Sequence, residues 1–337
     1  MFNNKKILFF SVKLFSIENK IENKLSSLGA IVDYYDERPS NSILVKGLIR
    51  LKRDLYKRRI DNYYRKILYE IKDKEYDFLF LIKGEVIPEF FLKKFCESNP
   101  SAKRIFYTWD SFNNNNNSKK ILKYFQSKIT FDSYDAKQFG LDLQPLFFFD
   151  SFKGIKKINN FKHHLLFIGT AHSDRYILAN KIVDWCNDKE LSSYTFFYLQ
   201  GRIVYFFKRI FDSTFKYFDY KKLSFKSLTE QDIIDLYKDS NVILDINHPS
   251  QKGLTMRTLE AVGARKKIIT TNPEIKKYIF YNENNILVID RNNIVLNEDF
   301  FTGPYQDIPE QIYDALSIEG WLKSIFFKNQ IEKWIVE

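Results

Sequence analysis

Apolar and polar residues alternate in blocks along the first half of the chain, where short apolar runs are separated by longer segments with helical spacing. The runs of strand length cover residues 5–12, 30–35, 77–83, 104–109 and 128–132. The segments with helical spacing cover residues 16–28, 42–73, 88–98 and 118–127. Continuous apolar strands separated by helices are typical of a parallel sheet that helices cover on both faces. The pattern predicts an α/β domain.

A second alternation of the same kind begins at residue 164. Its strand-length runs cover residues 164–169, 194–199, 241–246, 267–271 and 286–289, and its helical patterns cover residues 173–188, 255–263 and 307–316. The stretch between the two halves, residues 150–162, is polar, and residues 320–336 again show helical spacing. We therefore expect two doubly wound, Rossmann-like domains that face a cleft, over residues 1–155 and 156–318, followed by a last helix over 319–337.

Composition narrows the class of protein. The chain has 337 residues, 17% of them aromatic, which excludes a disordered protein. Its formal net charge is +11, but Lys, Asn, Ile, Phe and Tyr are abundant as in an AT-rich genome, so the charge permits an anionic partner without requiring one. Cys96 and Cys186 stand far apart, which excludes a disulfide scaffold and a cysteine zinc site and favours the cytoplasm. No apolar run approaches the ~18 residues of a membrane-spanning helix.

The motifs of the commonest phosphate, dinucleotide and metal sites are absent from the sequence. It contains no G-x-G-x-x-G, P-loop, H-E-x-x-H or D-x-D, so neither a metal nor another cofactor is expected. In open α/β sheets, ligands bind where strands end and helices begin, because free N–H groups and the helix dipole attract anions there. Three polar strand ends of the second half meet this description, at residues 167–175, 247–260 and 270–273.

The first of these segments runs from an apolar strand through Gly169 and Thr170 to Arg175. One interpretation is a simple turn in which Ser173 or Asp174 caps the next helix. The other is a binding site in which a diphosphate approaches Gly169 and Thr170 and Arg175 lies nearby.

The second segment runs from His248 through Gly253 to Thr255, which is a candidate N-cap residue. Arg257 and Glu260 follow one helical turn apart, on the same face of the helix. They form either a surface ion pair or a binding site. In the second case Arg257 binds a phosphate and Glu260 accepts hydrogen bonds from both hydroxyls of a ribose.

These segments resemble bacterial glycosyltransferases of the GT-B fold, and most of all the group encoded in lipopolysaccharide, O-antigen and capsule gene clusters. The resemblance rests mainly on residues 253–263 and 267–272, with weaker support from residues 275–286, 106–111, 131–135, 144–148 and 167–175. It spans both domains, from about residue 5 to residue 290.

The resemblance implies that the second domain binds a nucleotide-sugar without a metal and that the first domain binds the acceptor. It also implies that the last helix crosses back to the first domain. The donor-binding residues would be Gly169, Thr170, Arg175, His248, Gly253, Thr255, Arg257 and Glu260. Many retaining members carry two glutamates eight positions apart. Glu260 matches the second of them, but Lys252 stands at the first, so the donor sugar and the choice between retention and inversion stay open.

Asp110 is the candidate catalytic residue. Transfer to a sugar hydroxyl with inversion needs a base that takes the acceptor proton. Asp110 follows the apolar strand at 104–109, so the strand-end rule places it at the edge of the cleft, and Trp109 beside it can stack on a sugar. The alternatives are a strand-end or helix-capping aspartate without chemistry, and a retaining mechanism that needs no such base.

Two stretches combine basic residues with aromatic or aliphatic ones. Residues 46–66 form either the solvated basic face of a long helix or an interfacial helix on anionic lipid. Residues 202–226 have a composition that also suits single-stranded nucleic acid, but no DNA or RNA motif accompanies it.

The sequence thus predicts a metal-independent glycosyltransferase of surface polysaccharide synthesis. It would move a sugar from a nucleotide-sugar to a lipid-linked or growing polysaccharide acceptor, on the inner face of the cytoplasmic membrane. The expected partners are donor, acceptor and membrane surface, and no nucleic acid. Two alternatives stay open: a polyol-phosphate transferase, whose usual histidine-glycine-threonine motif is absent, and a non-enzymatic basic protein that binds membrane or nucleic acid.

Overall fold

The structure is a computed structural model, and it describes all of the chain except residues 113–115, 156–160, 213–214, 216–217, 250, 328–330 and 337. In the first turns of one long helix, the side chains of residues 43–44, 46 and 48–54 also lie outside the described part. The run of five asparagines at 113–117 and the basic stretch at 46–66 fall partly on these residues.

The chain divides into two compact units, which are described separately here. The first comprises Met1–Pro145 and Ile318–Glu332, and the second comprises Leu146–Ser317 and Lys333–Glu337. The first unit ends ten residues before the boundary that we expected at residue 155. The reason is that the aromatic residues just after Pro145 pack into the second unit: the ring of Phe148 lies 5.0 Å from that of Tyr313, and the ring of Phe152 lies 5.1 Å from that of Tyr237.

The first unit is built on a parallel six-stranded sheet with the order β2-β1-β3-β4-β5-β6. Its strands are β1 (Lys6–Ser11), β2 (Ile31–Asp36), β3 (Phe78–Ile82), β4 (Lys103–Thr108), β5 (Ser127–Thr130) and β6 (Asp142–Leu143). Every residue of β3 is buried, as expected for a central strand with both faces covered. In the register, Ile7 lies opposite Phe78, and Phe78 lies opposite Lys103.

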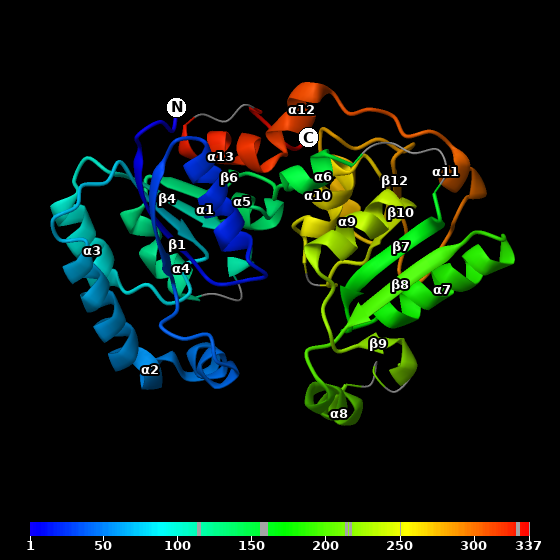
Figure 1. Cartoon of the computed structure of the whole chain (residues 1–337), viewed down its shortest axis with the longest axis horizontal. Coiled ribbons are helices and arrows are strands. Elements are labelled where there is room, and N and C mark those ends of the chain that lie inside the picture. The colour runs from blue at the N-terminus through cyan, green and yellow to red at the C-terminus, as the bar shows by residue number, and fades with distance from the viewer. Residues whose placement is uncertain are drawn as a thin grey trace. The chain divides into compact units, whose positions relative to one another are not determined.

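Helices cover both faces of this sheet (Figure 1). They are α1 (Ile17–Ser27), α2 (Ile43–Glu70), α3 (Glu89–Ser98), α4 (Asn116–Ile121), α5 (Ser133–Phe139) and α13 (Ile318–Phe326), with the 3-10 turn η2 (Leu122–Tyr124). Side chains of α2 and α3 share a core cluster with Leu8 and Phe10 of β1. On the other face, the ring of Trp321 from α13 lies 5.0 Å from that of Tyr107.

The last helix therefore packs on the first sheet, which confirms the predicted return of the chain to the first unit. The helix is shorter than the expected residues 320–336, because α13 ends at Phe326. The terminal residues return to the second unit instead, where Ile279 donates a backbone hydrogen bond to the carbonyl of Trp334 at 3.1 Å.

The second unit repeats the design with a parallel sheet of order β12-β11-β10-β7-β8-β9. Its strands are β7 (His163–Thr170), β8 (Ser193–Tyr198), β9 (Leu223–Ser224), β10 (Ser240–Asp245), β11 (Lys267–Thr270) and β12 (Ile286–Val288). Its helices are α6 (Asp150–Lys153), α7 (Arg175–Asp188), α8 (Arg202–Phe211), α9 (Glu230–Lys238), α10 (Met256–Gly263), α11 (Glu298–Thr302) and α12 (Glu310–Ala315), with the 3-10 turns η4 (Tyr220–Lys222) and η5 (Pro273–Lys277). Two six-stranded parallel sheets with interleaved helices confirm the predicted α/β class. No helix in the described part of the chain is both long and apolar enough to span a bilayer.

Candidate functional site

The candidate site lies at the carboxyl edge of the second sheet. Strand β7 ends at Thr170, β10 at Asp245 and β11 at Thr270. Because neighbouring strands of a parallel sheet run the same way, these ends meet at one edge, and the loops that follow them carry the predicted donor-binding residues.

Arg175 is fixed between two of these strand ends. Its Nη1 donates a hydrogen bond to Thr170 Oγ1 at 3.1 Å, and its Nε donates to the carbonyl of Ile246 at 2.7 Å. Burial lowers the pKa of the Arg175 guanidinium, which nonetheless stays charged because an arginine is protonated throughout the physiological range. Within the described part of the chain Arg175 forms no ion pair. The carboxylates of Asp245 and Asp174 act on its charge only from a longer distance.

Gly169 fits this turn because the ring of Phe167 leaves no room for a side chain. A Cβ at Gly169 would lie 2.8 Å from Phe167 Cζ. The alternative interpretation is a helix capped by Ser173 or Asp174. Asp174 does occupy the N-cap position of α7, but its carboxylate makes no capping hydrogen bond.

The Asp174 carboxylate instead binds Arg291, a residue that the sequence pattern did not single out. Arg291 Nη1 lies 2.8 Å from Asp174 Oδ1 and 2.7 Å from Oδ2. Its Nη2 donates to Asn247 Oδ1 at 2.8 Å and to Thr271 Oγ1 at 3.1 Å. Arg291 thus ties together the loops that follow β7, β10 and β11. It stands in a loop after a three-residue strand, where no periodic or motif signal marks it.

The loop after β10 is held by side chains that follow neighbouring strands. Asn272 Nδ2 donates to the carbonyls of Lys252 at 3.0 Å and Gly253 at 3.4 Å. Thr255 is the N-cap residue of α10, as predicted, and its Oγ1 accepts a hydrogen bond from Thr258 N at 3.2 Å. The two threonine hydroxyls also donate to Asp245 Oδ2, at 2.9 and 2.6 Å, so this buried carboxylate orients the start of the helix.

Arg257 and Glu260 form the expected i,i+3 pair, with Arg257 Nη1 lying 3.0 Å from Glu260 Oε2. The pair is not a surface pair, because the two side chains are only 21% and 16% exposed. The hydroxyl of Tyr237 on α9 donates to Glu260 Oε2 at 3.4 Å and accepts from Arg257 Nη1 at 3.3 Å. Burial opposes the charged form of Arg257, but Tyr237 and Glu260 outweigh it and leave the pKa of Arg257 raised.

His172 and His248 belong to the loops of the same edge, and their ring centroids lie 5.8 Å apart. Burial, followed by the charge of Arg175, lowers the pKa of His172 to about 4, so His172 is neutral at pH 7. His248, the histidine predicted to contact the donor, is exposed in the loop after β10. All the predicted donor-binding residues therefore belong to this edge or to the helices that begin there: Gly169, Thr170, Arg175, His248, Gly253, Thr255, Arg257 and Glu260. The positive charges of Arg257 and Arg291 add to burial in lowering the pKa of Arg175.

Asp110 belongs to the first unit, at the carboxyl edge of its own sheet. Lys83 Nζ lies 3.3 Å from Asp110 Oδ2 and 3.8 Å from Glu85 Oε1. Arg38 Nε donates to Glu85 Oε2 at 2.6 Å. The four side chains form a chain of alternating charge that begins at the buried Arg38 and ends at Asp110, which is 34% exposed.

A fully buried glutamate supports this chain. Glu37 Oε1 accepts hydrogen bonds from the backbone N–H groups of Val86 at 2.6 Å and Ile87 at 3.2 Å. Burial raises the pKa of Glu37 to about 7. The turn that it holds includes Lys83, which has a φ of +84°, a conformation that is costly for a residue with a side chain and is often found at functional sites.

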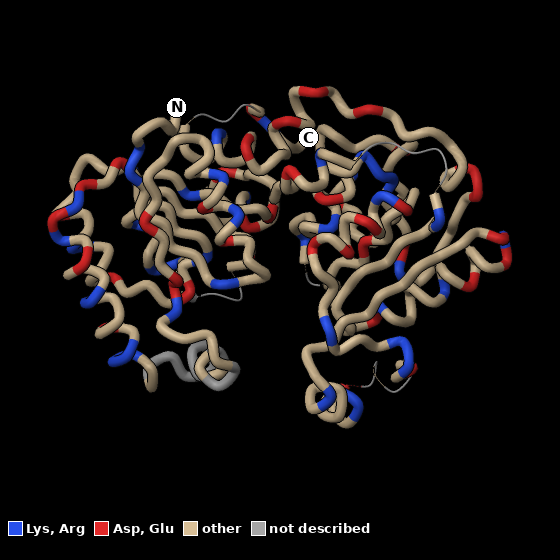
Figure 2. The backbone as a smooth tube through the Cα atoms, in the orientation of Figure 1, with Lys and Arg blue, Asp and Glu red and all other residues tan. Residues whose placement is uncertain are grey.

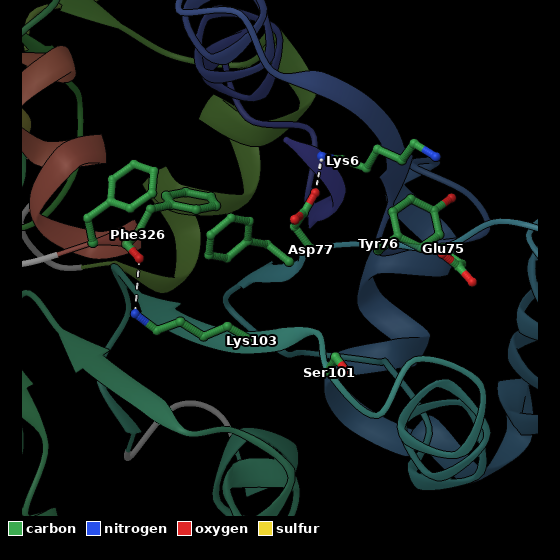
Figure 3. Close-up of a pocket in the computed structure, with 9 residues that line it drawn as sticks. Lys6, Glu75, Tyr76, Asp77, Ser101, Lys103 and Phe326 are labelled. Atoms are coloured by element: carbon green, nitrogen blue, oxygen red, sulfur yellow. Dashed lines mark hydrogen bonds between the residues drawn. The ribbon is translucent and has the colours of Figure 1, made fainter. Parts of the chain in front are cut away.

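A groove of the first unit lies away from Asp110 (Figure 3). It has a volume of about 800 Å³ and is lined by Lys6, Tyr76, Asp77, Lys103 and Phe326, among others. Lys6, Asp77 and Lys103 stand at or next to the amino ends of β1, β3 and β4. Lys103 Nζ donates to the carbonyl of Phe326, the last residue of α13, at 3.0 Å. The groove is therefore at the opposite edge of the sheet from the chain that ends at Asp110.

No group of three or more His, Cys, Asp or Glu side chains in the described part of the chain is arranged to hold a metal ion. No protein-family model matches the sequence, and no curated protein matches it.

Solved structures do match the fold. A glycosyltransferase from Rickettsia africae ESF-5 aligns over 96% of this chain and 99% of its own, with a TM-score of 0.56 and 13% sequence identity. The two proteins share a fold. Anabaena HepE in complex with UDP-glucose aligns over 96% of this chain and 93% of its own, with 11% identity, but its TM-score is 0.49. A similarity that low supports no conclusion. The predicted GT-B type of α/β fold is confirmed at the level of the fold.

Proposed function

We propose that the protein is a metal-independent glycosyltransferase that takes a sugar from a nucleotide-sugar bound at the carboxyl edge of the second sheet. The observation that carries the proposal is the position of Arg175. Its half-buried guanidinium spans two strand ends and has no ion-pair partner among the described residues. Such a cation favours an anionic ligand, and hydrogen bonds from arginine to phosphate are among the strong ones.

The neighbouring groups suit the rest of a nucleotide. Arg257 adds positive charge near Arg175, and the Glu260 carboxylate can accept hydrogen bonds from ribose hydroxyls. The loop that carries His248 and Gly253 is held by Asn272. In this assignment the arginines balance the charge of the diphosphate without a metal, and the fold shared with a Rickettsia glycosyltransferase supports the reaction class.

The first unit takes the acceptor in this proposal, and Asp110 is its catalytic base. A base has to be exposed to the acceptor hydroxyl and oriented by its neighbours. Asp110 meets both conditions, because it is the exposed end of a chain of charges whose other members are held in place. The acceptor is a lipid-linked or growing surface polysaccharide, of the lipopolysaccharide O-antigen or capsule kind, and the protein works in the cytoplasm on the inner face of the membrane.

Calorimetric titration tests the donor part of the proposal. UDP, GDP and CDP are each titrated into the protein in separate experiments, and so are uridine, guanosine and cytidine. The matching nucleotide-sugars are then titrated in the same way. One diphosphate should bind with micromolar affinity, far more tightly than its nucleoside. A polyol-phosphate transferase should instead prefer a CDP-polyol over every nucleotide-sugar, and a non-enzymatic basic protein should bind all the diphosphates weakly and alike. Either result would overturn the proposal.

A further inference from the structure

Helix α8 presents an apolar face to solvent. Five of its ten residues are large hydrophobic side chains that are mostly exposed: Ile203 by 74%, Phe206 by 62%, Phe207 by 56%, Ile210 by 55% and Phe211 by 79%. Their spacing of three and four residues places them on one side of the helix. None of the ten residues is buried, so the folding of the unit leaves this face uncovered.

The inner face of α8 fixes the helix to its unit. The ring of Tyr205 lies 5.1 Å from that of Tyr220, and Lys208 Nζ lies 4.7 Å from the centre of the Phe215 ring. Lys208 also pairs with Asp212 at 3.6 Å. Because these contacts hold the polar side of the helix inward, the phenylalanine side points outward. Figure 1 shows α8 at the periphery of the second unit, beyond β8 and β9.

Exposed basic residues accompany the apolar face, on the helix and on the segment that follows it. Arg202 and Arg209 are exposed on α8 itself, and Lys221, Lys222 and Lys226 are exposed on the segment that follows (Figure 2). The acidic residues of the sequence between 202 and 226 are Asp212 and Asp219. Asp212 pairs with Lys208, and Asp219 accepts a hydrogen bond from the backbone N–H of Lys221 at 2.9 Å. The surface is therefore an apolar strip with a cationic border.

The positive charge near α8 indicates which kind of partner covers its apolar face. A second copy of the chain placed on this face would bring two cationic borders together, and each copy already carries a formal net charge of +11. An anionic bilayer complements both features, since its headgroups attract the cations and its acyl boundary accepts the rings.

The long basic helix of the first unit lacks this arrangement where its side chains are described. In α2, Tyr56, Ile60, Tyr64 and Ile67 are buried in the core of the unit, while Arg58 and Arg59 are exposed. Exposed arginines fit both interpretations of residues 46–66, so both stay open. Its Arg50 and Arg53 side chains lie outside the described residues.

We propose that α8 is a membrane-contact helix, which lies in the surface of a bilayer that contains anionic lipid and inserts Ile203, Phe206, Phe207, Ile210 and Phe211. Arg202, Arg209 and the lysines after the helix bind the headgroups. The inference deepens the membrane part of the proposed function by naming the surface and the lipid charge. It stands on α8 alone, whether or not the protein transfers a sugar.

Vesicle sedimentation at ~0.1 M salt, where surface charges are only partly screened, tests the proposal. The protein should bind vesicles of phosphatidylcholine with phosphatidylglycerol and bind much more weakly to phosphatidylcholine alone. The Phe206→Ser/Phe207→Ser variant should lose about tenfold or more in affinity for the anionic vesicles. The matched control is Tyr134→Ser, at an exposed aromatic residue of α5 in the first unit, and it should bind like the parent protein.

A charge variant separates the two contributions. Arg202→Glu/Arg209→Glu should weaken binding to anionic vesicles by about 30-fold or more and remove most of the preference for them, since each basic residue near such a surface contributes about fivefold. Nucleotide affinity, measured by calorimetry, should be unchanged in every variant, so a failure of the donor site cannot be mistaken for a failure of α8.

Three results would overturn the proposal. The first is equal sedimentation of the parent and the double-serine variant. The second is a dimer in light scattering without lipid that the double-serine variant converts to a monomer, because a second copy would then cover α8. The third is binding of a single-stranded oligonucleotide that lipid vesicles do not displace and that the same variant abolishes.

Discussion

The carboxyl edges of the two sheets share a topology and differ in charge arrangement. At the first edge, Arg38, Glu85 and Lys83 lead to Asp110, so that the most exposed member is a carboxylate. At the second edge, the carboxylates are bound by hydroxyls and guanidinium groups, as Asp174 is by Arg291. Arg175, a cation at this edge, forms no ion pair among the described residues.

The comparison teaches that one architecture provides two kinds of surface. Parallel strands bring their ends to one edge in both units, but the residues just after the strands decide whether that edge presents a proton acceptor or an anion site. The first arrangement suits an acceptor hydroxyl, and the second suits a diphosphate. Each of the following measurements tests this division.

The largest effect is expected at Asp110. Asp110→Asn removes a group that can take a proton and keeps its size, so single-turnover transfer from the preferred donor should fall by about 10²-fold or more. Donor affinity should not change, because the donor residues belong to the other unit. Asp142→Asn, at an exposed aspartate of the first unit, should transfer normally. Normal turnover by Asp110→Asn would remove the proton acceptor from the first edge.

The pH dependence of stability should reveal Glu37. Its pKa is about 7 in the folded unit against an ordinary value of 4.5, so the folded state holds this proton more tightly than the unfolded chain. Its contribution to the free energy of unfolding is therefore fully present below about pH 4.5 and is lost as the pH rises to about 7. Glu37→Gln stays neutral and should remove this loss, which amounts to about 3 kcal/mol.

Urea unfolding at pH 5 and pH 8 measures the difference. The parent protein should lose more stability between the two values than Glu37→Gln does, and Glu283→Gln, at an exposed glutamate, should follow the parent. Parallel behaviour of Glu37→Gln and the parent would mean that Glu37 is ionised in the folded state. The charge chain would then begin with an additional anion.

At the second edge, Arg175→Met should weaken binding of the preferred nucleoside diphosphate by about 10- to 100-fold, the range for a hydrogen bond to a charged group. The nucleoside should bind as before, because it has no phosphate to lose. Arg202→Met, at an exposed arginine of the same unit, is the control and should bind both ligands normally. An equal loss for nucleoside and diphosphate would indicate that Arg175 only supports the fold.

The smallest effect concerns Arg257 and Glu260. A double-mutant cycle to alanine should give a coupling of about 1 kcal/mol in the free energy of unfolding, since the pair is mostly buried. The exposed i,i+3 pair of Lys94 and Glu97 is the matched comparison and should give about 0.5 kcal/mol or less. Equal couplings would mean that water screens Arg257 and Glu260 as it screens a surface pair.

Much of the fold could be predicted from local patterns. The buried run at β3 and the apolar runs at β1, β10 and β11 were recognised within two residues of their ends, because strands covered on both faces are continuously apolar. Helix α9 was not predicted, although it carries a capping box at Thr229 and Asp232. Thr255 was recognised as a cap because capping depends on residues only three positions apart.

The candidate site could be predicted only in part. Asp110, Arg175, Arg257 and Glu260 were found because they follow strands or begin helices, where the topology places ligands. Arg291 has no such signal, since its partner Asp174 stands 117 positions earlier in the chain. The sequence also offered a cap at Asp174, but the long-range partner Arg291 occupies that carboxylate instead.

Sequence alone predicts the α/β class, most of the order of strands and helices, and the strand ends that carry the candidate residues. Those properties follow from hydrophobic period and from caps that span three or four residues. Only the tertiary structure decided that Lys83 lies beside Asp110, that Phe148 belongs to the second unit and that the phenylalanines of α8 point outward. These outcomes depend on which distant segments pack against each residue. A local period reports that a helix has an apolar face and does not report whether the fold covers it.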